Sequence, residues 1–296
     1  LGLLDKGPLR GLIYQFTVLY RADYMHAGIA MLLHNPLTGV GIDSYDDWYR
    51  AERGIISALR TSLNRTANSA HNISIDLIYG IPTLTNEKWI QNIDKAVALE
   101  VQHLSCYALT VEPKTPLNAL ILKGEKEDID SAKQAAHFEL LTKHAARAGY
   151  EHYELSNFAL AGYRSKHNTS YWKQEEYLGI GPSAHSFNGV SRQYNIANNT
   201  KYVQQIGTGL IPATLEILTK EDQINEYLLT GLRTIWGCKI EYLDSILGSS
   251  FLDLQKSYLQ PILRAGHLEI IEHTLKLTEA GKLFADRIAS DLFVEE

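Results

Sequence analysis

The segment "SKHNTSYW", residues 165–172, holds a compact grouping of side chains that could do chemistry. His167 and Asn168 stand three or four residues before the pair Tyr171 and Trp172. A neutral imidazole is a common metal ligand, and aromatic rings offer flat apolar faces to a planar ligand. The segment has neither a helical nor a strand period, so it predicts a functional loop that other elements must position.

The elements that could position this loop begin near residue 71. "NISIDLIYG" (72–80) predicts a buried strand, Thr85 is placed to cap a helix over 86–100, and "HLSCYALT" (103–110) predicts a second strand. A helix over about 129–148 ends at Gly149, and a further short strand follows over 150–156. Strands separated by helices favour parallel pairing, so the fold class is α/β, as a barrel or a doubly wound sheet.

In the remainder of the chain, the composition and the hydrophobic pattern change twice. Residues 157–189 are rich in Gly, Asn, Ser and aromatics and predict loop with short extended pieces. From residue 219, amphipathic helices lead to a hairpin over 268–277, and Thr278 caps a last helix. This order predicts a winged-helix-like unit. Residues 1–70 show no clean period, and their best helical pattern lies at 44–63.

Composition and charge limit the class of protein. The 296 residues are 45% apolar and 21% charged, which is typical of a soluble globular protein. No run of about 18 apolar residues is present, and the two cysteines form no disulfide framework, so we expect a cytoplasmic protein without a membrane span. The net charge of −6 is concentrated after residue 220. Nucleic-acid binding would need a basic stripe there, so we expect no nucleic-acid partner.

Several strings, taken in order, resemble one family. They are "SIDLIYGIP", "LSCYALTVEPKTPL", "GYEHYELSNFALAGYRSKHNTSYW", "YLGIGPSAHSF", "LLTGLRTIWG" and "LTEAGKLFADRI". Together they are similar to the HemW-type haem chaperones, relatives of oxygen-independent coproporphyrinogen III oxidase, over residues 71–296. The resemblance implies a partial radical SAM (β/α) barrel over 71–215 and a HemN-type C-terminal domain over 216–296. Residues 1–70 stay unassigned, because they look unlike the family's N-terminal half.

The resemblance also implies a 4Fe-4S cluster and S-adenosylmethionine, yet the family's cluster motif is absent from this chain. A CxxxCxxC loop supplies three thiolates to three irons. Cys106 lies in a predicted strand and Cys238 near a helix end, and the chain has no other cysteine. The family's GGGTP stretch is missing, and "GIPTLT" replaces the usual GLPGQT. The N-terminal half is therefore missing or altered, and we expect no radical chemistry, no catalytic residue and no metal site.

Two sets of site residues follow from the resemblance. Asp76, placed at the C-terminal end of its strand, and Ala108 match positions that line the S-adenosylmethionine site; the alternative is that Asp76 caps a neighbouring loop. HNxxYW is typical of the chaperone branch, which makes haem the expected ligand of the remaining candidates, His167, Asn168, Tyr171, Trp172 and His185. The alternative is that these residues satisfy backbone groups and fill the core.

Glu151 and Glu154 form another acidic pair, with His152 between them. We expect them on one face of a solvated strand edge rather than in a catalytic site.

Three functions remain open at this point. The leading interpretation is a HemW-like haem chaperone that binds haem or porphyrin and delivers it to a haem-receiving protein. The first alternative is an oxygen-independent coproporphyrinogen III oxidase, which decarboxylates a propionate side chain oxidatively. The second is a non-catalytic protein-interaction module. A half barrel would also leave sheet edge and apolar surface open, which predicts poor solubility or self-association.

Overall fold

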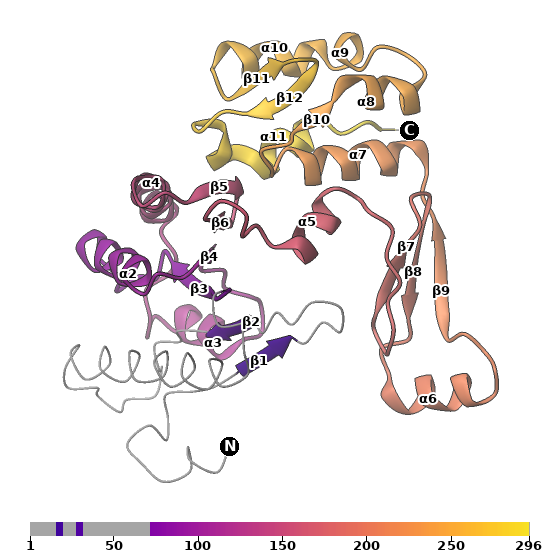
Figure 1. The fold of residues 1–296 in the computed structure, drawn as a ribbon, viewed down its shortest axis with the longest axis horizontal. Coiled ribbons are helices and arrows are strands. Elements are labelled where there is room, and N and C mark those ends of the chain that lie inside the picture. Colours follow the sequence, from indigo (N-terminus) through magenta and orange to yellow (C-terminus); the bar gives the residue numbers. More distant parts are fainter. Residues whose placement is uncertain (1–15, 20–27, 32–71, 296) are drawn as a thin grey trace. The chain divides into compact units, whose positions relative to one another are not determined.

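The computed structural model describes residues 16–19, 28–31 and 72–295 (Figure 1). The chain divides into two compact units, Leu1–Arg164 and Ser165–Glu296. The helical pattern predicted at 44–63 and most of the unassigned segment 1–70 lie outside the described residues. The finer predicted division at residue 215 stays a prediction.

The first unit contains one four-stranded sheet and, before it, a short antiparallel hairpin. The strands predicted at 72–80, 103–110 and 150–156 are confirmed, and so are both predicted helices, with Thr85 as N-cap. Its described elements are β1 (Phe16–Leu19), β2 (Gly28–Met31), β3 (Ser74–Tyr79), α2 (Asn86–Ala98), β4 (His103–Ala108), α3 (Pro116–Leu122), α4 (Ser131–Arg147), β5 (Glu151–Glu154) and β6 (Asn157–Ala159).

The sheet is parallel only in part. Its order is β3-β4-β6-β5, with β3 and β4 parallel in full register, as predicted, and the other two pairs antiparallel. β5 and β6 are joined by two residues only, and such a short connection forces an antiparallel hairpin. β6, which we predicted as loop, therefore occupies the place beside β4 that a further parallel strand would take.

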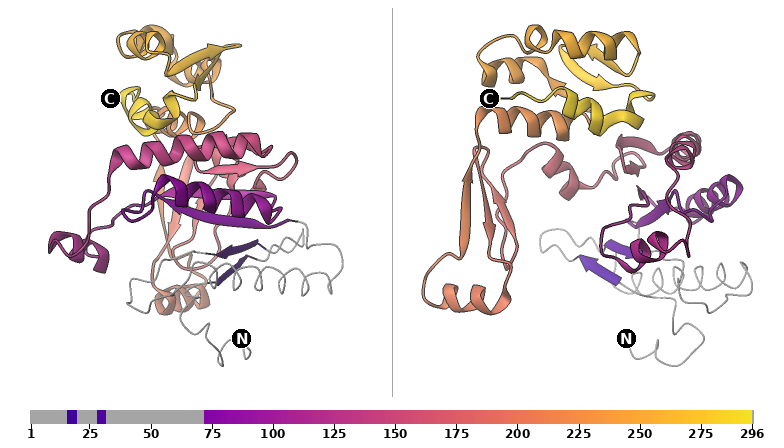
Figure 2. Two further views of the ribbon diagram at one scale, coloured as in Figure 1. Left: turned by 90° about the vertical axis from the view of Figure 1, so that its left-hand side faces the viewer. Right: turned by 180° about the vertical axis from the view of Figure 1, so that it is seen from behind.

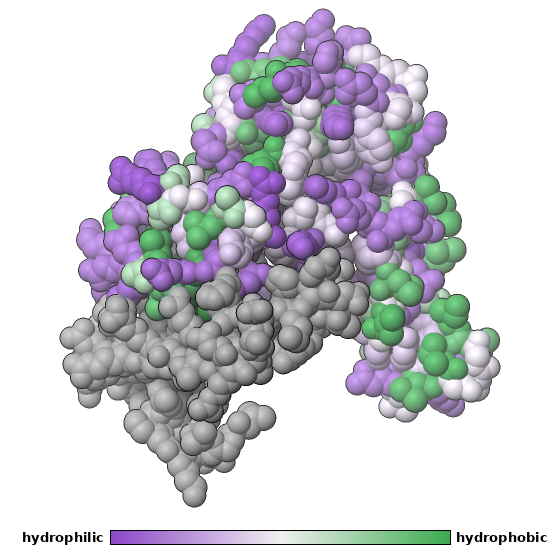
Figure 3. Space-filling view, in the orientation of Figure 1, coloured by the Kyte–Doolittle hydropathy of each residue, from purple (hydrophilic) through white to green (hydrophobic). Residues whose placement is uncertain are grey.

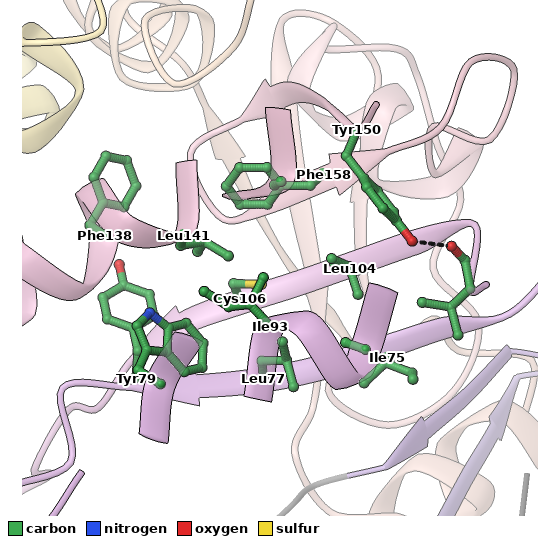
Figure 4. Close-up of a cluster of buried hydrophobic side chains, with 14 residues drawn as sticks. Ile75, Leu77, Tyr79, Ile93, Leu104, Cys106, Phe138, Leu141, Tyr150 and Phe158 are labelled. Carbon is green, nitrogen blue, oxygen red and sulfur yellow. Dashed lines mark hydrogen bonds between the residues drawn. The ribbon is translucent and has the colours of Figure 1, made fainter. Parts of the chain in front are cut away.

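The core of this unit lies between the sheet and the helices α2 and α4, which run side by side (Figure 2). Strand alternation places Ile75, Leu77 and Tyr79 of β3 on the helix side, and the burial of β3 follows this period of two. The buried cluster continues through Trp89, Ile93, Ala96, Val101, Leu104, Cys106, Phe138, Leu141, Ala145, Tyr150 and Phe158 (Figure 4). The Tyr150 hydroxyl donates a hydrogen bond to the Val101 carbonyl, which ties the end of α4 to the start of β4.

The opposite face of the sheet is polar. His103 is buried there, with Nδ1 2.7 Å from Ser74 Oγ and Nε2 2.7 Å from Tyr153 Oη. Burial lowers the pKa of His103 to about 4. The imidazole is therefore neutral at pH 7, and its two hydrogen bonds join three strands.

The second unit begins with a short helix, continues into a three-stranded antiparallel sheet and ends in a mainly helical part. The helix α5 (Lys166–Trp172) corrects the predicted loop, because the Ser165 side chain caps it and ring contacts described below hold it. The other elements are β7 (His185–Phe187), β8 (Ser191–Asn195), α6 (Asn199–Gly207), β9 (Ala213–Ile217), α7 (Lys220–Gly231), β10 (Cys238–Lys239), α8 (Ile240–Leu247), α9 (Phe251–Leu254), α10 (Lys256–Arg264), β11 (Leu268–Ile271), β12 (Thr274–Leu277), η1 (Gly281–Phe284) and α11 (Ala285–Asp291).

The last part of this unit has the predicted winged-helix-like arrangement. The hairpin β11–β12 is confirmed, and β10 adds to it as a third strand, so Cys238 lies in a strand rather than at a helix end. Gly237 precedes β10 with φ of 66°, and an added Cβ would lie 2.2 Å from the Leu275 carbonyl oxygen. Thr278 Oγ1 accepts a hydrogen bond from Gly281 N, but the N-cap of η1 is Ala280 and that of α11 is Phe284, so the predicted Thr278 cap of the last helix is wrong.

Replacing Trp89 by Ala should lower the free energy of unfolding of the first unit by about 3–5 kcal/mol. Trp89 is fully buried on α2, and its Nε1 donates to the His137 carbonyl on α4 at 2.9 Å. The substitution opens a cavity and leaves that carbonyl without its donor. Urea denaturation followed by near-UV circular dichroism measures the loss. Leu122→Ala on α3, where the side chain is exposed, is the matched control and should change stability by less than about 0.5 kcal/mol.

The neutral state of His103 predicts a specific loss of stability in acid. Its pKa falls from 6.5 to about 4 on folding, so the unfolded chain binds more protons between these values. The stability that His103 contributes is complete above pH 6.5 and is lost as the pH falls toward 4. His103→Gln, which does not titrate, should show a shallower decline of the urea midpoint over that range. Parallel curves for the two proteins would contradict this account.

Candidate functional site

The helix α5 carries most of the residues that the sequence singled out. Ser165 Oγ accepts a hydrogen bond from Asn168 N at 3.2 Å, which starts the helix directly before His167. His167 and Tyr171 are four residues apart and therefore share a helix face. Their rings meet edge to face at 4.9 Å between centroids, and both side chains are exposed. Asn168 is half-buried and takes part in the cap through its backbone.

Tyr177 connects α5 to the following sheet. Its ring lies 4.8 Å from Tyr171 and 6.1 Å from Phe187, and its backbone exchanges two 2.9 Å hydrogen bonds with Phe187 in β7. Burial raises the pKa of Tyr177, so its hydroxyl stays protonated at pH 7. The four rings of His167, Tyr171, Tyr177 and Phe187 form a continuous series, which we call the aromatic row.

His185 lies on the same sheet face as the end of the aromatic row. It stands two residues before Phe187 in β7, so both side chains project from one face. Its register partner on β8 is Tyr194, and the two rings are 5.9 Å apart. His185 and Tyr194 are both exposed. The structure thus places His167 and Tyr171 at one end of the aromatic row and His185 on the strand that carries Phe187 at its other end.

Trp172 has a different role from its neighbour Tyr171. Its ring lies beneath the Arg233 guanidinium, with 5.7 Å between Cζ and the ring centroid. Lys173 Nζ is 5.0 Å from the Trp236 ring centroid, so two cation–π contacts dock the end of α5 on the segment after α7. Trp172 is half-buried, and its Nε1 is buried without a hydrogen-bond partner. This placement agrees with the packing alternative for Trp172.

Asp76 and Ala108 lie on adjacent strands of the first unit but not on one face. Asp76 is the third of six residues in β3, so its predicted position at the end of the strand is wrong. Its register partner is Ser105, whereas Ala108 pairs with Tyr79 on the helix side. Burial raises the pKa of Asp76, and a hydrogen bond with Ser105 opposes this shift. Their assignment to S-adenosylmethionine stays a prediction.

The acidic pair on β5 is split by a register irregularity between His152 and Glu154. Glu151 is exposed and forms a bidentate pair with Arg164 at 2.6 Å, as a solvated edge predicts. Glu154 is only 2% exposed and accepts from Ser156 N at 3.0 Å and from Asn157 Nδ2 at 2.5 Å. The predicted shared, solvated face is therefore wrong for Glu154.

The chain's residues do not fit the cluster that the family resemblance implies. Three thiolates are needed, whereas the chain has Cys106 in the first unit and Cys238 in the second. Both thiols are buried, and burial raises their pKa above the usual range. Within the residues described, no three His, Cys, Asp or Glu side chains are grouped so that they could hold a metal ion.

Sequence reasoning missed Tyr177, Phe187 and Tyr194 as members of this surface. The first two flank "LGIGPSAHS", so an aromatic residue at each end of a Gly-containing segment was the available signal. Tyr194 had no such signal, because its position depends on the β7–β8 register.

Comparisons with known proteins agree with the resemblance seen in the sequence. Residues 218–284 match the model of the HemN C-terminal domain. The chain is 34% identical over 219 residues to the heme chaperone HemW of Bacillus subtilis, covering 73% of this chain and 58% of that protein. It is 28% identical to the heme chaperone HemW of Mycobacterium tuberculosis, covering 94% of this chain and 67% of that protein. The chain thus spans between half and two thirds of the length of these relatives.

The fold comparison points the same way. A solved structure of coproporphyrinogen III oxidase (HemN) from Escherichia coli, a radical SAM enzyme, superposes with a TM-score of 0.63 at 18% identity, covering 82% of this chain and 59% of that one. This confirms the predicted fold class, a partial radical SAM fold followed by a helical C-terminal domain. The chain is therefore a member of the HemW-type family of radical SAM proteins.

Proposed function

We propose that this chain binds haem on the aromatic row and acts as a HemW-like haem chaperone. The observation that supports this most directly is an exposed imidazole, His167, at the end of a row of aromatic rings. A haem macrocycle is flat and largely apolar, and its iron takes an imidazole as axial ligand. The exposed end of the row, His167 and Tyr171, offers both kinds of contact, while Phe187 at the other end is buried.

His167 is the axial ligand in this proposal, and His185 is the second candidate. Tyr171 is 41% exposed, so a macrocycle can reach its ring without unfolding α5. His185 and Tyr194 extend the surface on the sheet face beyond Phe187. Asn168 positions the first turn of α5 through the Ser165 cap, and Trp172 anchors its last residue.

The names of the relatives support haem as the ligand, since those from Bacillus subtilis and Mycobacterium tuberculosis are heme chaperones. The partner would be a protein that receives haem from the chain. No helix in the part of the chain that the structure describes is both long and apolar enough to cross a bilayer. We propose no radical step, because the chain's two buried thiols do not fit a 4Fe-4S cluster.

The proposal predicts that His167→Ala weakens haem binding by at least about tenfold, or ~1.4 kcal/mol, and changes the Soret band. Loss of an axial nitrogen ligand alters both affinity and the iron's electronic spectrum. An anaerobic haem titration of the purified chain measures both quantities. His185→Ala should weaken binding less, because the proposed ligand remains.

The matched control is a histidine away from the row. His273 is exposed in the β11–β12 turn with φ of 57°, where Asn is tolerated, so His273→Asn should bind haem as the parent does. Equal binding by all four proteins would refute the haem-binding row. Loss confined to His185→Ala would reassign the ligand to His185.

Anaerobic reconstitution with iron, sulfide and S-adenosylmethionine should yield neither a cluster signal nor reductive cleavage of the cofactor. A cluster needs three thiolate ligands, whereas the chain has two cysteines and both thiols are buried. Electron paramagnetic resonance and chromatography of the nucleoside products provide the measurement. A stoichiometric 4Fe-4S signal together with 5′-deoxyadenosine would show that the chain does radical chemistry.

A further inference from the structure

Among the residues that the structure describes, β9 is the open edge of the sheet β7-β8-β9 in the second unit (Figure 1). The other edge is occupied, since Tyr177 exchanges two backbone hydrogen bonds with Phe187 of β7. An edge strand with unpaired backbone groups is a template for another strand.

The backbone groups of β9 that face outward are those of its odd-numbered residues. Leu218 N bonds to Val190 O, and Ile196 N bonds to Pro212 O, so the even-numbered positions of this segment face β8. In an antiparallel pair, successive residues direct their backbone groups alternately toward the partner strand and away from it. The N–H and C=O groups of Leu215 and Ile217 therefore point away from β8. Neither residue has a hydrogen-bond partner on that side among the described residues.

The same residues expose apolar side chains. Leu215 is 61% exposed and Ile217 is 69% exposed, and both project from one face together with Ala213. Figure 3 shows hydrophobic side chains gathered over the part of this unit that holds β9 and α6. Other exposed apolar residues on α6 or next to β9 in the chain or the sheet are Val190, Val203, Ile206, Leu210 and Ile211. Patches of this kind on a folded protein mark interaction sites.

We propose that β9 pairs with β9 of a second copy of this chain, antiparallel and centred on Leu215. Leu215 of each copy then exchanges two backbone hydrogen bonds with its mate. Ile217 N donates to Ala213 O at each end, while Ala213 N keeps its bond to Ile211 O. The result is a continuous six-stranded sheet about a two-fold axis, in which each residue pair occurs twice.

The sequence of β9 is self-complementary in this register, which favours a second copy over an unrelated strand. Leu215 faces Leu215, and Ala213 faces Ile217, so apolar residues meet on one face. Glu216 faces Thr214 on the other face, so no two carboxylates stand directly opposite each other. Shifting the register by one residue toward Glu216 would bring the two Glu216 side chains together. This interface goes beyond the proposed function and requires no haem.

The test is a pair of cysteine substitutions at neighbouring positions. In the proposed register the two Leu215 Cα atoms form a hydrogen-bonded pair about 5.5 Å apart, within reach of a disulfide. The two Glu216 Cα atoms are offset by two residues along the strands and lie about 8 Å apart, outside that reach. Cys106 and Cys238 are buried and do not compete.

L215C should form a disulfide-linked dimer on mild oxidation, seen as a dimer band in non-reducing denaturing electrophoresis. E216C should form no disulfide and should run as a monomer band on the same gel. Crosslinking of both variants, or of neither, would overturn the proposed register.

A second measurement does not depend on the cysteine variants. Sedimentation should give a dimer for the parent chain and a monomer for Leu215→Lys and for Leu215→Glu, since each places like charges opposite each other. Mixing the two charged variants should restore a dimer. A parent chain that sediments as a monomer, or as an open series of larger assemblies, would overturn the proposal. Leu254→Lys, at an exposed leucine on α9, is the control and should remain a dimer.

Discussion

The two backbone hydrogen bonds between Tyr177 and Phe187 are the constraint on which the second unit's surface depends. They fix the segment between α5 and β7 and place the Tyr177 ring between those of Tyr171 and Phe187. They also occupy the outer side of β7, so that, among the described residues, β9 is the edge of the sheet β7-β8-β9 that stays open. The bridge between Tyr177 and Phe187 thus affects both which rings lie side by side and which edge of the sheet is open to another strand.

The ion pair of Arg192 with Glu226 has a related effect. Arg192 Nη2 lies 2.7 Å from both carboxylate oxygens, and it ties β8 to α7. Together with the contacts of Trp172 and Lys173, this pair holds α5 and the sheet against the helical part of the same unit. The aromatic row is therefore supported from both ends.

Elements with a strong local signal could be predicted from the sequence. The alternation in β3, the Thr85 cap of α2 and the turn between β11 and β12 depend on residues within a few positions of each other. α5 could not be predicted, because seven residues carry too little periodicity and its stability comes from rings elsewhere in the chain. The strand β9 and its partner β8 could not be predicted either, because β9 is exposed on both faces and lacks the burial pattern of a strand. Of the candidate site, the sequence indicated His167, Tyr171 and His185, but the role of Trp172 as an anchor requires Arg233, more than 60 residues away.

The burial of both cysteines has a consequence for chemical durability. A thiol reacts with peroxides and disulfides as its thiolate, and burial keeps Cys106 and Cys238 protonated and out of reach. The two thiols, each buried in a different unit, are therefore shielded from conversion to sulfenic acids or mixed disulfides.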